Sequence, residues 1–246
     1  MPYRKPFPVP EYNCDSGGKL KLSMVMRYMQ ATSGEQLDTL GYTYEYLFAE
    51  NLVFLLSQTC IKIYEMPRAG QEIVVGTTAT GTKGVRFLRD FIVEDTVGNR
   101  LIDAHTLWVL VDSLSRKILR PSAFSHNIPI KESLLGAGMS ALAIPKVDAP
   151  NWDTQWNQRV GYSLIDVNHH INNSVYADFV CDSLPMEALT ARGLDSVVIA
   201  FQNEARQGDM LAIQATAPAA QEAAGYLVRG IKEDGSSCFE AFAVLK

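Results

Sequence analysis

One order of predicted elements occurs twice along the 246-residue chain. In each copy, a stretch whose apolar residues recur at helical spacing precedes four runs in which apolar and polar residues alternate as in strands. The helices are predicted over residues 22–40 and 172–189. A helix followed by an antiparallel meander buries the apolar face of its sheet against the helix. The repeat therefore predicts an α+β chain, with two sheets or one long shared sheet and a helix packed on each half.

Turn and cap residues separate the predicted elements. Ser23 can cap the first helix and Gly41 can end it, whereas Pro185 interrupts or bends the second helix and Gly193 can end it. The strand-like runs cover residues 59–64, 72–80, 86–94 and 101–112 in the first copy, and 196–203, 210–217, 224–231 and 238–245 in the second.

A short local match supports the repeat. Residues 68–71 (Arg-Ala-Gly-Gln) align with residues 206–209 (Arg-Gln-Gly-Asp) at an offset of 208 − 70 = 138, and both precede an alternating strand. A long central helix wrapped by antiparallel sheet is the hotdog fold, and two in one chain form a double hotdog, a covalent pseudo-dimer. We expect an N-terminal hotdog over residues 1–125 and a C-terminal hotdog over residues 156–246. Between them, residues 126–155 are expected to be a proline-containing linker, with a short helix over 133–142.

Charge and cysteine content exclude several classes of protein. A net charge of −5 and a pI of about 5.4 argue against a nucleic-acid or anionic-membrane binder, which needs a basic surface. The four cysteines form no CxxC pair and fit neither a zinc site nor a dense disulfide scaffold, so we expect reduced thiols in a cytoplasmic protein. The first residues lack the apolar core of a signal peptide, and no apolar run is long enough to span a bilayer.

The segment before the second helix carries the candidate chemistry. Asp166, Asn168 and His170 alternate, so in an extended chain they project to one side. Residues 172–174 (Asn-Asn-Ser) are cap-type residues at the helix start, where free backbone N–H groups can bind a developing oxyanion. A carboxylate, an amide and an imidazole beside such a site could catalyse acyl transfer to water. The same residue types also occur before helices as ordinary caps and turn formers.

The motif D-V-N-x-H-x-N-N-x-x-Y at residues 166–176 resembles the signature of plant-type acyl-acyl carrier protein thioesterases and their bacterial relatives. Residues 108–112 (Trp-Val-Leu-Val-Asp) and 115–117 (Ser-Arg-Lys) also resemble that family, and the likeness covers nearly the whole chain. The resemblance implies a double hotdog whose N-terminal half shapes the acyl pocket and whose C-terminal half carries catalysis.

The resemblance also implies catalytic residues and one departure from the plant pattern. The positions that match are Asp166, Asn168, His170 and Glu204. Ala205 stands where plant members carry a cysteine that is a proposed nucleophile of the family, so a cysteine–histidine mechanism is excluded at this position. Cys181, inside the second predicted helix, is expected to be a buried thiol without a catalytic role.

The expected activity is hydrolysis of fatty acyl-acyl carrier protein thioesters, which releases free fatty acid in fatty acid biosynthesis. Asp166 would activate water as a base or attack as a nucleophile, and the sequence leaves both routes open. Asn168 would hold the carbonyl or fix Asp166, and His170 would orient the water or protonate the leaving thiolate. Glu204 would act as a second carboxylate that hydrogen-bonds His170 or the water. We expect no metal and no cofactor beyond the substrate's pantetheine, because the sequence has no phosphate loop, nucleotide fingerprint or metal-spaced cluster.

The expected activity needs an apolar slot for the acyl chain and a basic surface for the carrier. An acyl chain needs an apolar slot, for which the first half offers Met24, Met26, Met29, Phe48, Leu52 and Phe54. Acyl carrier proteins are acidic, so docking on a chain of net charge −5 needs a local basic surface. The candidates for this surface are Arg86, Arg89, Arg116, Lys117, Arg120 and Arg206. The expected partner is thus an acyl carrier protein, with no nucleic acid and no membrane span, and a homodimer is compatible with the sequence.

Other functions remain open at this level. An acyl-CoA thioesterase or an enoyl-thioester hydratase could share the fold, but a hydratase is expected to show D-x-x-x-x-H, whereas Asp166 and His170 are spaced D-x-x-x-H. A non-catalytic acyl-binding module with a regulatory role would need none of the four matched residues. The acyl chain length and the choice between carrier protein and CoA are not given by the sequence.

Overall fold

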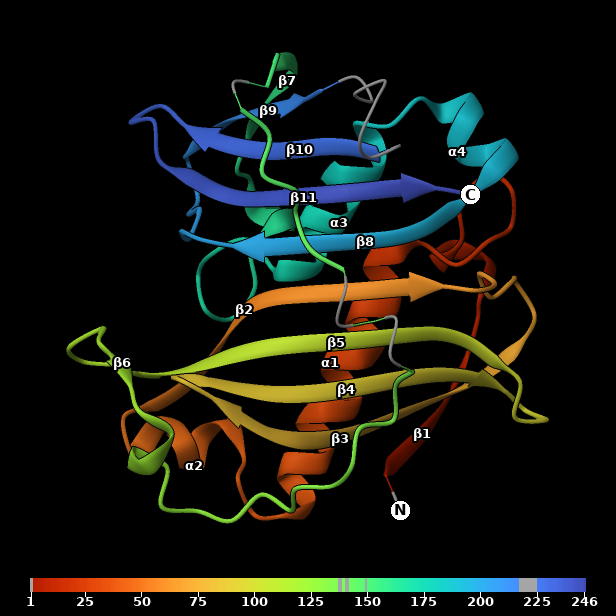
Figure 1. The fold of residues 1–246 in the computed structure, drawn as a ribbon. Helices are drawn as coiled ribbons and strands as arrows, with labels where there is room; N and C mark the ends of the chain where they lie inside the picture. Colours follow the sequence, from red (N-terminus) through yellow and green to blue (C-terminus); the bar gives the residue numbers. More distant parts are fainter. Residues whose placement is uncertain (1, 137–138, 140–141, 149, 217–224) are drawn as a thin grey trace. The chain divides into compact units, whose positions relative to one another are not determined.

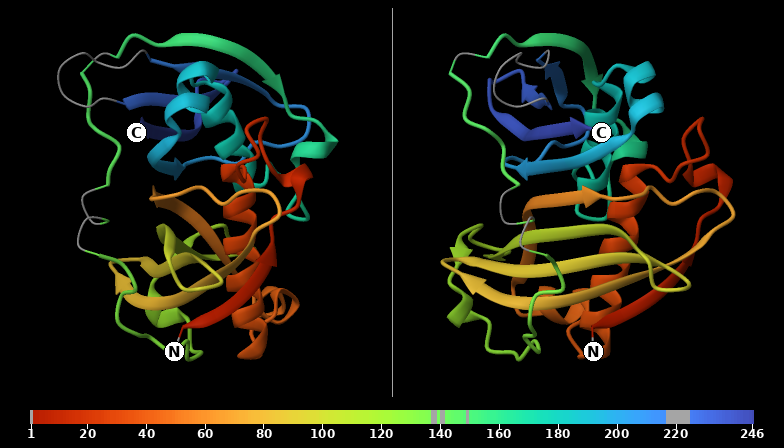
Figure 2. Two further views of the ribbon diagram at one scale, coloured as in Figure 1. Left: turned by 90° about the vertical axis from the view of Figure 1, so that its right-hand side faces the viewer. Right: turned by 45° about the vertical axis from the view of Figure 1, so that its right-hand side comes forward.

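The computed structural model describes residues 2–136, 139, 142–148, 150–216 and 225–246. The chain divides into two compact units, one of Met1–Leu20 with Met24–Met139 and one of Lys21–Ser23 with Ser140–Lys246. Each unit has a central helix beside an antiparallel sheet (Figures 1 and 2). The predicted α+β architecture is therefore present in both units. Within the described residues, no helix is long and apolar enough to cross a membrane.

In the first unit, the sheet has the strand order β1-β3-β4-β5-β2, with every neighbouring pair antiparallel and β6 added to β5. The strands are β1 (Tyr3–Pro8), β2 (Leu52–Ile63), β3 (Glu72–Lys83), β4 (Arg86–Asp95), β5 (Arg100–Asp112) and β6 (Ile118–Leu119). The helices are α1 (Leu22–Thr39) and the short α2 (Tyr44–Ala49). The prediction of a long helix and four strands is confirmed, although Ser23 lies inside α1 rather than at its cap. The sequence pattern misses β1, which tolerates Pro6 and Pro8 because it is an edge strand paired only with β3.

In the second unit, the sheet has the order β8-β11-β10-β9-β7, again with antiparallel neighbours. The strands are β7 (Asp153–Arg159), β8 (Leu194–Phe201), β9 (Met210–Ala215), β10 (Gly225–Lys232) and β11 (Ser237–Leu245). The helices are α3 (Asn173–Asp182) and α4 (Met186–Arg192). Pro185 interrupts the predicted helix, which is one of the two outcomes that the sequence indicates, and it precedes α4 as its N-cap with a ψ of 115°. Gly193 ends α4 with a φ of 76°, as the sequence predicts.

The segment predicted as a linker has structure of its own. Strand β7 lies partly within it, and Ile130 pairs with Ala79 of β3 through an isolated bridge. Of the short helix predicted over 133–142, residues 133–136 are not helical, and residues 137, 138, 140 and 141 lie outside the described part of the chain.

The aligned glycine turns are equivalent in the two units. Gly70 and Gly208 both have positive φ, 83° and 95°, a conformation that favours glycine. The Gly70 N–H donates to Val9 O at 2.8 Å, and the Gly208 N–H donates to Val160 O at 2.9 Å. The short sequence match therefore reflects one turn geometry built twice, and each turn fastens the chain that leads into the helix of its own unit.

Candidate active site

The segment around Asp166 is a closed loop rather than the extended chain that the sequence predicts. Ile165 and Ile171 pair as an isolated antiparallel bridge, and the Asp166 N–H donates to His170 O at 3.0 Å. At the turn between them, His169 has a φ of 63°, which is rare for a residue other than glycine. The expectation that alternate residues of an extended strand project to one side is therefore wrong here. The three candidate residues are instead brought together by a turn.

The Asp166 carboxylate organises this loop. Its Oδ1 accepts a hydrogen bond from the Asn168 N–H at 2.9 Å, and its Oδ2 accepts one from Asn172 Nδ2 at 3.1 Å. Asn172 is also the N-cap of α3, because its Oδ1 accepts bonds from Ser174 N at 3.0 Å and from Ser174 Oγ at 2.7 Å. Asp166 is therefore tied to the first turn of α3 through one asparagine side chain.

These bonds correct the predicted oxyanion site. The Ser174 N–H is taken by the Asn172 side chain, and the Val175 N–H donates to Asn172 O at 2.9 Å. The backbone N–H groups of these two residues are therefore not free at the helix start. The expectation of an open set of helix donors is wrong at both positions, because the cap that the sequence itself supplies satisfies them.

The first unit contains the same loop with different side chains. Asp15 Oδ1 accepts from the Gly17 N–H at 2.8 Å, and the Asp15 N–H donates to Lys19 O at 2.7 Å. Gly18 has a φ of 71°, close to the value at His169. The aspartate and the turn are thus shared scaffold. The second unit differs by placing Asn168 and His170 where the first has glycine and lysine.

A second contact brings the loop beside the segment that contains Glu204. The Ile171 N–H donates to Ala205 O at 2.9 Å, and the backbone of His170 bridges that of Arg206. Glu204 is half-buried and forms an ion pair with Arg206 at 3.0 Å between Oε2 and Nη2. The four predicted residues thus belong to one neighbourhood of the second unit, although the Glu204 carboxylate is engaged by a cation.

The surroundings of this segment are partly apolar. Tyr176 is buried against Phe239, with ring centroids 4.8 Å apart, and burial raises the pKa of its hydroxyl. Backbone donation from Arg206, together with Lys232 at 3.1 Å, lowers the pKa of Asp209. The Glu204 carboxylate therefore lies in a network that already contains charged groups of both signs.

The Cys238 thiol of this unit is not activated. Burial raises the pKa of Cys238 to about 11, so its thiol is protonated at neutral pH. Cys181 lies in α3 as predicted but is half-buried rather than buried, and no disulfide joins the four cysteines, all of which belong to the described residues. The described residues contain no group of three or more histidine, cysteine or acidic side chains arranged to hold a metal ion.

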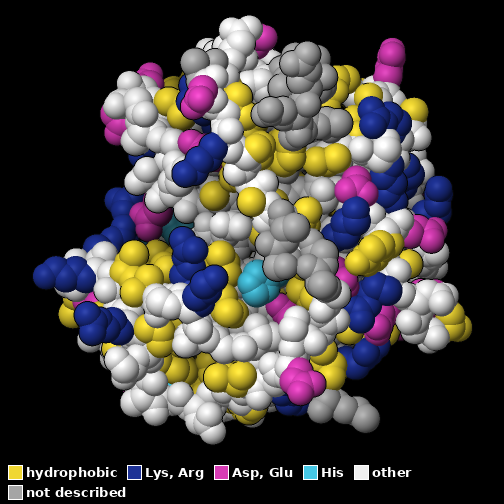
Figure 3. Space-filling model, viewed as in Figure 1, with side chains coloured by type: hydrophobic (Ala, Val, Ile, Leu, Met, Phe, Trp, Pro, Cys, Tyr) yellow, Lys and Arg dark blue, Asp and Glu magenta, His cyan; other side chains and the backbone are white. Residues whose placement is uncertain are grey.

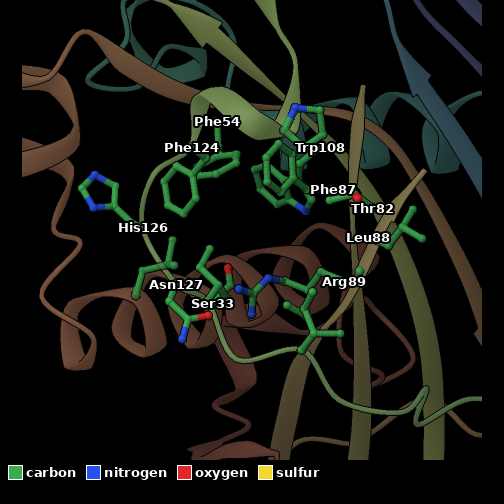
Figure 4. A pocket seen from close by; sticks show the side chains of 16 residues that line it. Ser33, Phe54, Thr82, Phe87, Leu88, Arg89, Trp108, Phe124, His126 and Asn127 are labelled. Atoms are coloured by element: carbon green, nitrogen blue, oxygen red, sulfur yellow. The ribbon is translucent and has the colours of Figure 1, made fainter. Parts of the chain in front are cut away.

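The first unit contains a cavity of about 230 Å³ on the α1 side of its sheet (Figure 4). Its aromatic lining comes from Phe54, Phe87, Trp108 and Phe124. Of the predicted acyl-slot residues, only Phe54 lines it, whereas Met26 and Met29 are core residues and Phe48 is 51 % exposed. The sequence thus predicted the region of the cavity but not most of its lining.

Arg89 is the clearest correction to the predicted basic surface. It lies on β4 and is 7 % exposed, so it cannot be part of a docking surface. Side chains alternate along a strand, and Arg89 shares the α1-facing side of β4 with Phe87 and Phe91. In the sequence, this alternation of two phenylalanines with one arginine could have predicted that Arg89 is buried.

Comparison with known proteins defines the class and then the family. The chain has the double hotdog fold: it matches an acyl-ACP thioesterase from Bacteroides thetaiotaomicron with a TM-score of 0.82 at 19 % identity, covering 99 % of this chain and 97 % of that one. A 12:0-ACP thioesterase from Umbellularia californica matches with a TM-score of 0.78 at 18 % identity, covering 99 % and 96 %.

Family models match residues 1–122 as the acyl-ACP thioesterase N-terminal domain and residues 149–240 as the C-terminal domain. The chain therefore belongs to the acyl-ACP thioesterase family. A chloroplastic acyl-[acyl-carrier-protein] hydrolase from Cuphea viscosissima is 22 % identical over 85 % of this chain. An oleoyl-acyl carrier protein thioesterase from Arabidopsis thaliana is 20 % identical over 86 %. The chain spans 53 % of the first of these relatives and 62 % of the second.

The link between the loop and α3 can be tested by stability. Asn172→Ala removes the helix cap and the tether to Asp166, and should lower the free energy of unfolding by about 0.5–2 kcal/mol. The matched control is Asn173→Ala, one residue further along, whose side chain makes no hydrogen bond within the described part of the chain. Urea unfolding should show a change below about 0.5 kcal/mol for the control. Equal effects of the two variants would contradict the assigned cap.

Proposed function

We propose that this protein hydrolyses fatty acyl-acyl carrier protein thioesters and releases free fatty acid. The observation that carries the proposal is the difference between two otherwise equivalent loops. Asp15 and Asp166 each accept a hydrogen bond from the backbone N–H two residues further on, but only the second loop adds an amide at Asn168 and an imidazole at His170. In the first unit, a glycine and a lysine at these two positions are enough to form the loop. We therefore attribute the amide and the imidazole of the second unit to a chemical role. Membership of the acyl-ACP thioesterase family supports the substrate class.

The loop can supply the groups that the reaction needs. Asp166 accepts a hydrogen bond at each oxygen, which holds its carboxylate in one orientation while leaving lone pairs for water or for the thioester carbon. In the proposed reaction, Asp166 either activates a water molecule that attacks the thioester carbon, or attacks that carbon itself to form a mixed anhydride that water then hydrolyses. In both routes the carbon–sulfur bond breaks and the thiolate of the carrier leaves. His170 orients the water or delivers a proton to the departing thiolate, and Asn168 holds the carbonyl or fixes Asp166. Glu204, held beside Arg206, is the proposed second carboxylate.

The proposed partner is an acyl carrier protein of the cytoplasm, and the carrier contributes its own pantetheine. We expect the hydrolytic activity not to depend on a cysteine. Ala205 is fully buried at the position of the plant cysteine, and the Cys238 thiol is protonated at neutral pH. Four described cysteines that form no disulfide fit a reducing compartment.

Asp166→Asn tests the chemistry of the loop. The amide can still accept the Asn168 N–H bond, so the loop should fold, but it can neither take a proton from water nor attack as a carboxylate. We expect kcat for release of free thiol from an acyl-carrier substrate to fall by more than about tenfold. The matched control is Asp15→Asn, which makes the same change in the loop of the first unit. It should alter the free energy of unfolding comparably and leave kcat close to that of the wild type.

Two results would count against this assignment. If purified Asp166→Asn kept more than about a tenth of kcat, a barrier change below ~1.4 kcal/mol, Asp166 would not be the central group. If Asp15→Asn lost as much activity as Asp166→Asn, the loss would come from loop destabilisation rather than from chemistry.

A basic hairpin tip offers a docking surface for the acidic carrier. Arg116 and Lys117 are exposed in the turn between β5 and β6, where Asp112 accepts the backbone bonds that close the turn. In Figure 3, Lys and Arg side chains gather over this hairpin at the left edge of the molecule. Arg86 and Arg120 are also exposed, whereas Arg89 is excluded by its burial.

Charge reversal at this hairpin tests the carrier. Arg116→Glu with Lys117→Glu should lower kcat/KM for acyl-carrier substrate at low salt and change kcat little, because rim charges act mainly on association. Rising salt should lower the wild-type kcat/KM in the same way. The control is Lys21→Glu with Arg27→Glu, at exposed positions, which changes net charge equally and should stay within about twofold. A flat salt response combined with equal or faster turnover of acyl-CoA would favour a CoA thioesterase instead.

A further inference from the structure

Arg89 is a buried cation in the cavity of the first unit without an acidic partner. Its guanidinium carries five N–H donors. Nη1 donates to Gln36 Oε1 on α1 and, at 3.1 Å, to Thr77 Oγ1 on β3. Both partners are neutral, and the described residues place no carboxylate within ion-pair distance of Arg89. Burial lowers the pKa of Arg89 to about 10, which still leaves the side chain charged at neutral pH.

The remaining donors of Arg89 open onto the cavity. Within the described residues, Thr59 Oγ1 is the one fully enclosed side-chain polar atom that has no hydrogen-bond partner. Nε and Nη2 of Arg89 also make no hydrogen bond within the described residues, and they are not among the fully enclosed atoms, so they retain accessible surface. Arg89 as a whole is 7 % exposed, and it lines the cavity. Figure 4 shows its side chain extending toward Ser33, on the side of the cavity opposite the aromatic rings of Phe87 and Phe124. The cation thus faces the cavity rather than the bulk solvent.

The rest of the cavity wall suits hydrocarbon. Phe54, Phe87 and Phe124 contact one another edge to face, with ring centroids 5.1 to 6.0 Å apart, and Trp108 completes an aromatic wall. A cavity of about 230 Å³ exceeds the ~150 Å³ that holds a benzene-sized ligand, so an alkyl segment fits. None of the described residues that line the cavity is acidic. Besides Arg89, the titratable group among them is His126, whose Nε2 is hydrogen-bonded to Glu50 Oε2 at 2.6 Å.

A saturated chain would match the aromatic wall but not the cation. An alkyl end that displaced water from Arg89 would leave guanidinium N–H groups without acceptors, and an unpaired buried charge is costly. A carboxylate would accept these bonds, often in pairs, and would neutralise the charge. The expected preference for a chain that ends in a carboxylate therefore comes from an aromatic wall and a cation that lie in one small cavity.

We propose that this cavity binds acyl chains that carry a carboxylate away from the thioester, with Arg89 as the residue that recognises that carboxylate. The inference rests on the proposed function, because it takes the cavity to hold the acyl chain of the substrate. It adds a substrate class, acyl groups derived from dicarboxylic acids, and a specificity-determining residue. Thr77 and Gln36 act as positioning residues that fix the guanidinium from the sheet and the helix.

Direct binding tests this proposal independently of turnover. Two stable ligands carry an amide in place of the thioester and have equal chain length, and one ends in a methyl group and the other in a carboxylate. Isothermal titration should give at least about tenfold tighter binding of the carboxylate-ended ligand to the wild type, equivalent to ~1.4 kcal/mol. Arg89→Met should abolish or reverse that preference, and Arg89→Lys should retain part of it. Arg27→Met, on the exposed side of α1, removes one charge elsewhere and should keep the wild-type preference.

The outcomes separate the two proposals. Equal or tighter binding of the methyl-ended ligand by the wild type would overturn the carboxylate subsite and leave thioester hydrolysis untouched. The same conclusion would follow if neither ligand bound while acyl-carrier substrate was hydrolysed, or if phosphopantetheine without an acyl chain bound through Arg89 in their place. Should Arg89→Met fail to fold, the comparison of two ligands on the wild type and on Arg89→Lys still decides the matter.

Discussion

Each unit depends on one interaction, the hydrogen bond that an aspartate carboxylate accepts from the backbone N–H two residues further on. Asp15 and Asp166 make this bond at 2.8 and 2.9 Å, and it closes the loop that precedes each central helix. The closed loop then pairs with the segment before a glycine turn, through Leu20 in one unit and Ile171 in the other. Because the loop is fixed on both sides, the direction in which each helix begins is fixed as well.

The two units use this scaffold differently. In the second unit, the loop carries an amide and an imidazole and is tied to α3 through Asn172. In the first unit, glycine and lysine occupy those positions, and the distinctive feature is the cavity between α1 and the sheet, with its aromatic wall and Arg89. In the proposed scheme, one copy of the fold supplies the reaction chemistry and the other recognises the acyl chain, and both proposals follow from the side chains that differ.

From the sequence, we could predict the helices and strands that show a clear hydrophobic periodicity. The central helices and the strands that follow them were recovered because their alternation reflects a sheet with one face buried against a helix. Strand β1 and the start of β2 were missed, since prolines hide an edge strand and the Leu52–Leu56 run lacks alternation. At the candidate site, the residue identities could be read from the motif, but the turn at His169 could not, because a positive φ at a non-glycine residue is set by the loop closure around it. Arg89 was placed on the surface because a lone arginine in a strand is usually exposed, although its alternation with Phe87 and Phe91 already indicates the buried face of β4.

The most direct test makes the loop that contains Asp166 resemble its counterpart in the first unit. A double variant, Asn168→Gly with His170→Lys, gives the loop of the second unit the side chains of the first while keeping Asp166 and the turn. Release of free thiol from an acyl-carrier substrate is measured against wild type, with circular dichroism and thermal unfolding as checks on the fold. The account predicts a native fold with kcat reduced by at least about a hundredfold, the range that acid–base groups contribute. A folded variant that kept kcat within about threefold of the wild type, far short of that contribution, would contradict the assignment of catalysis to this loop.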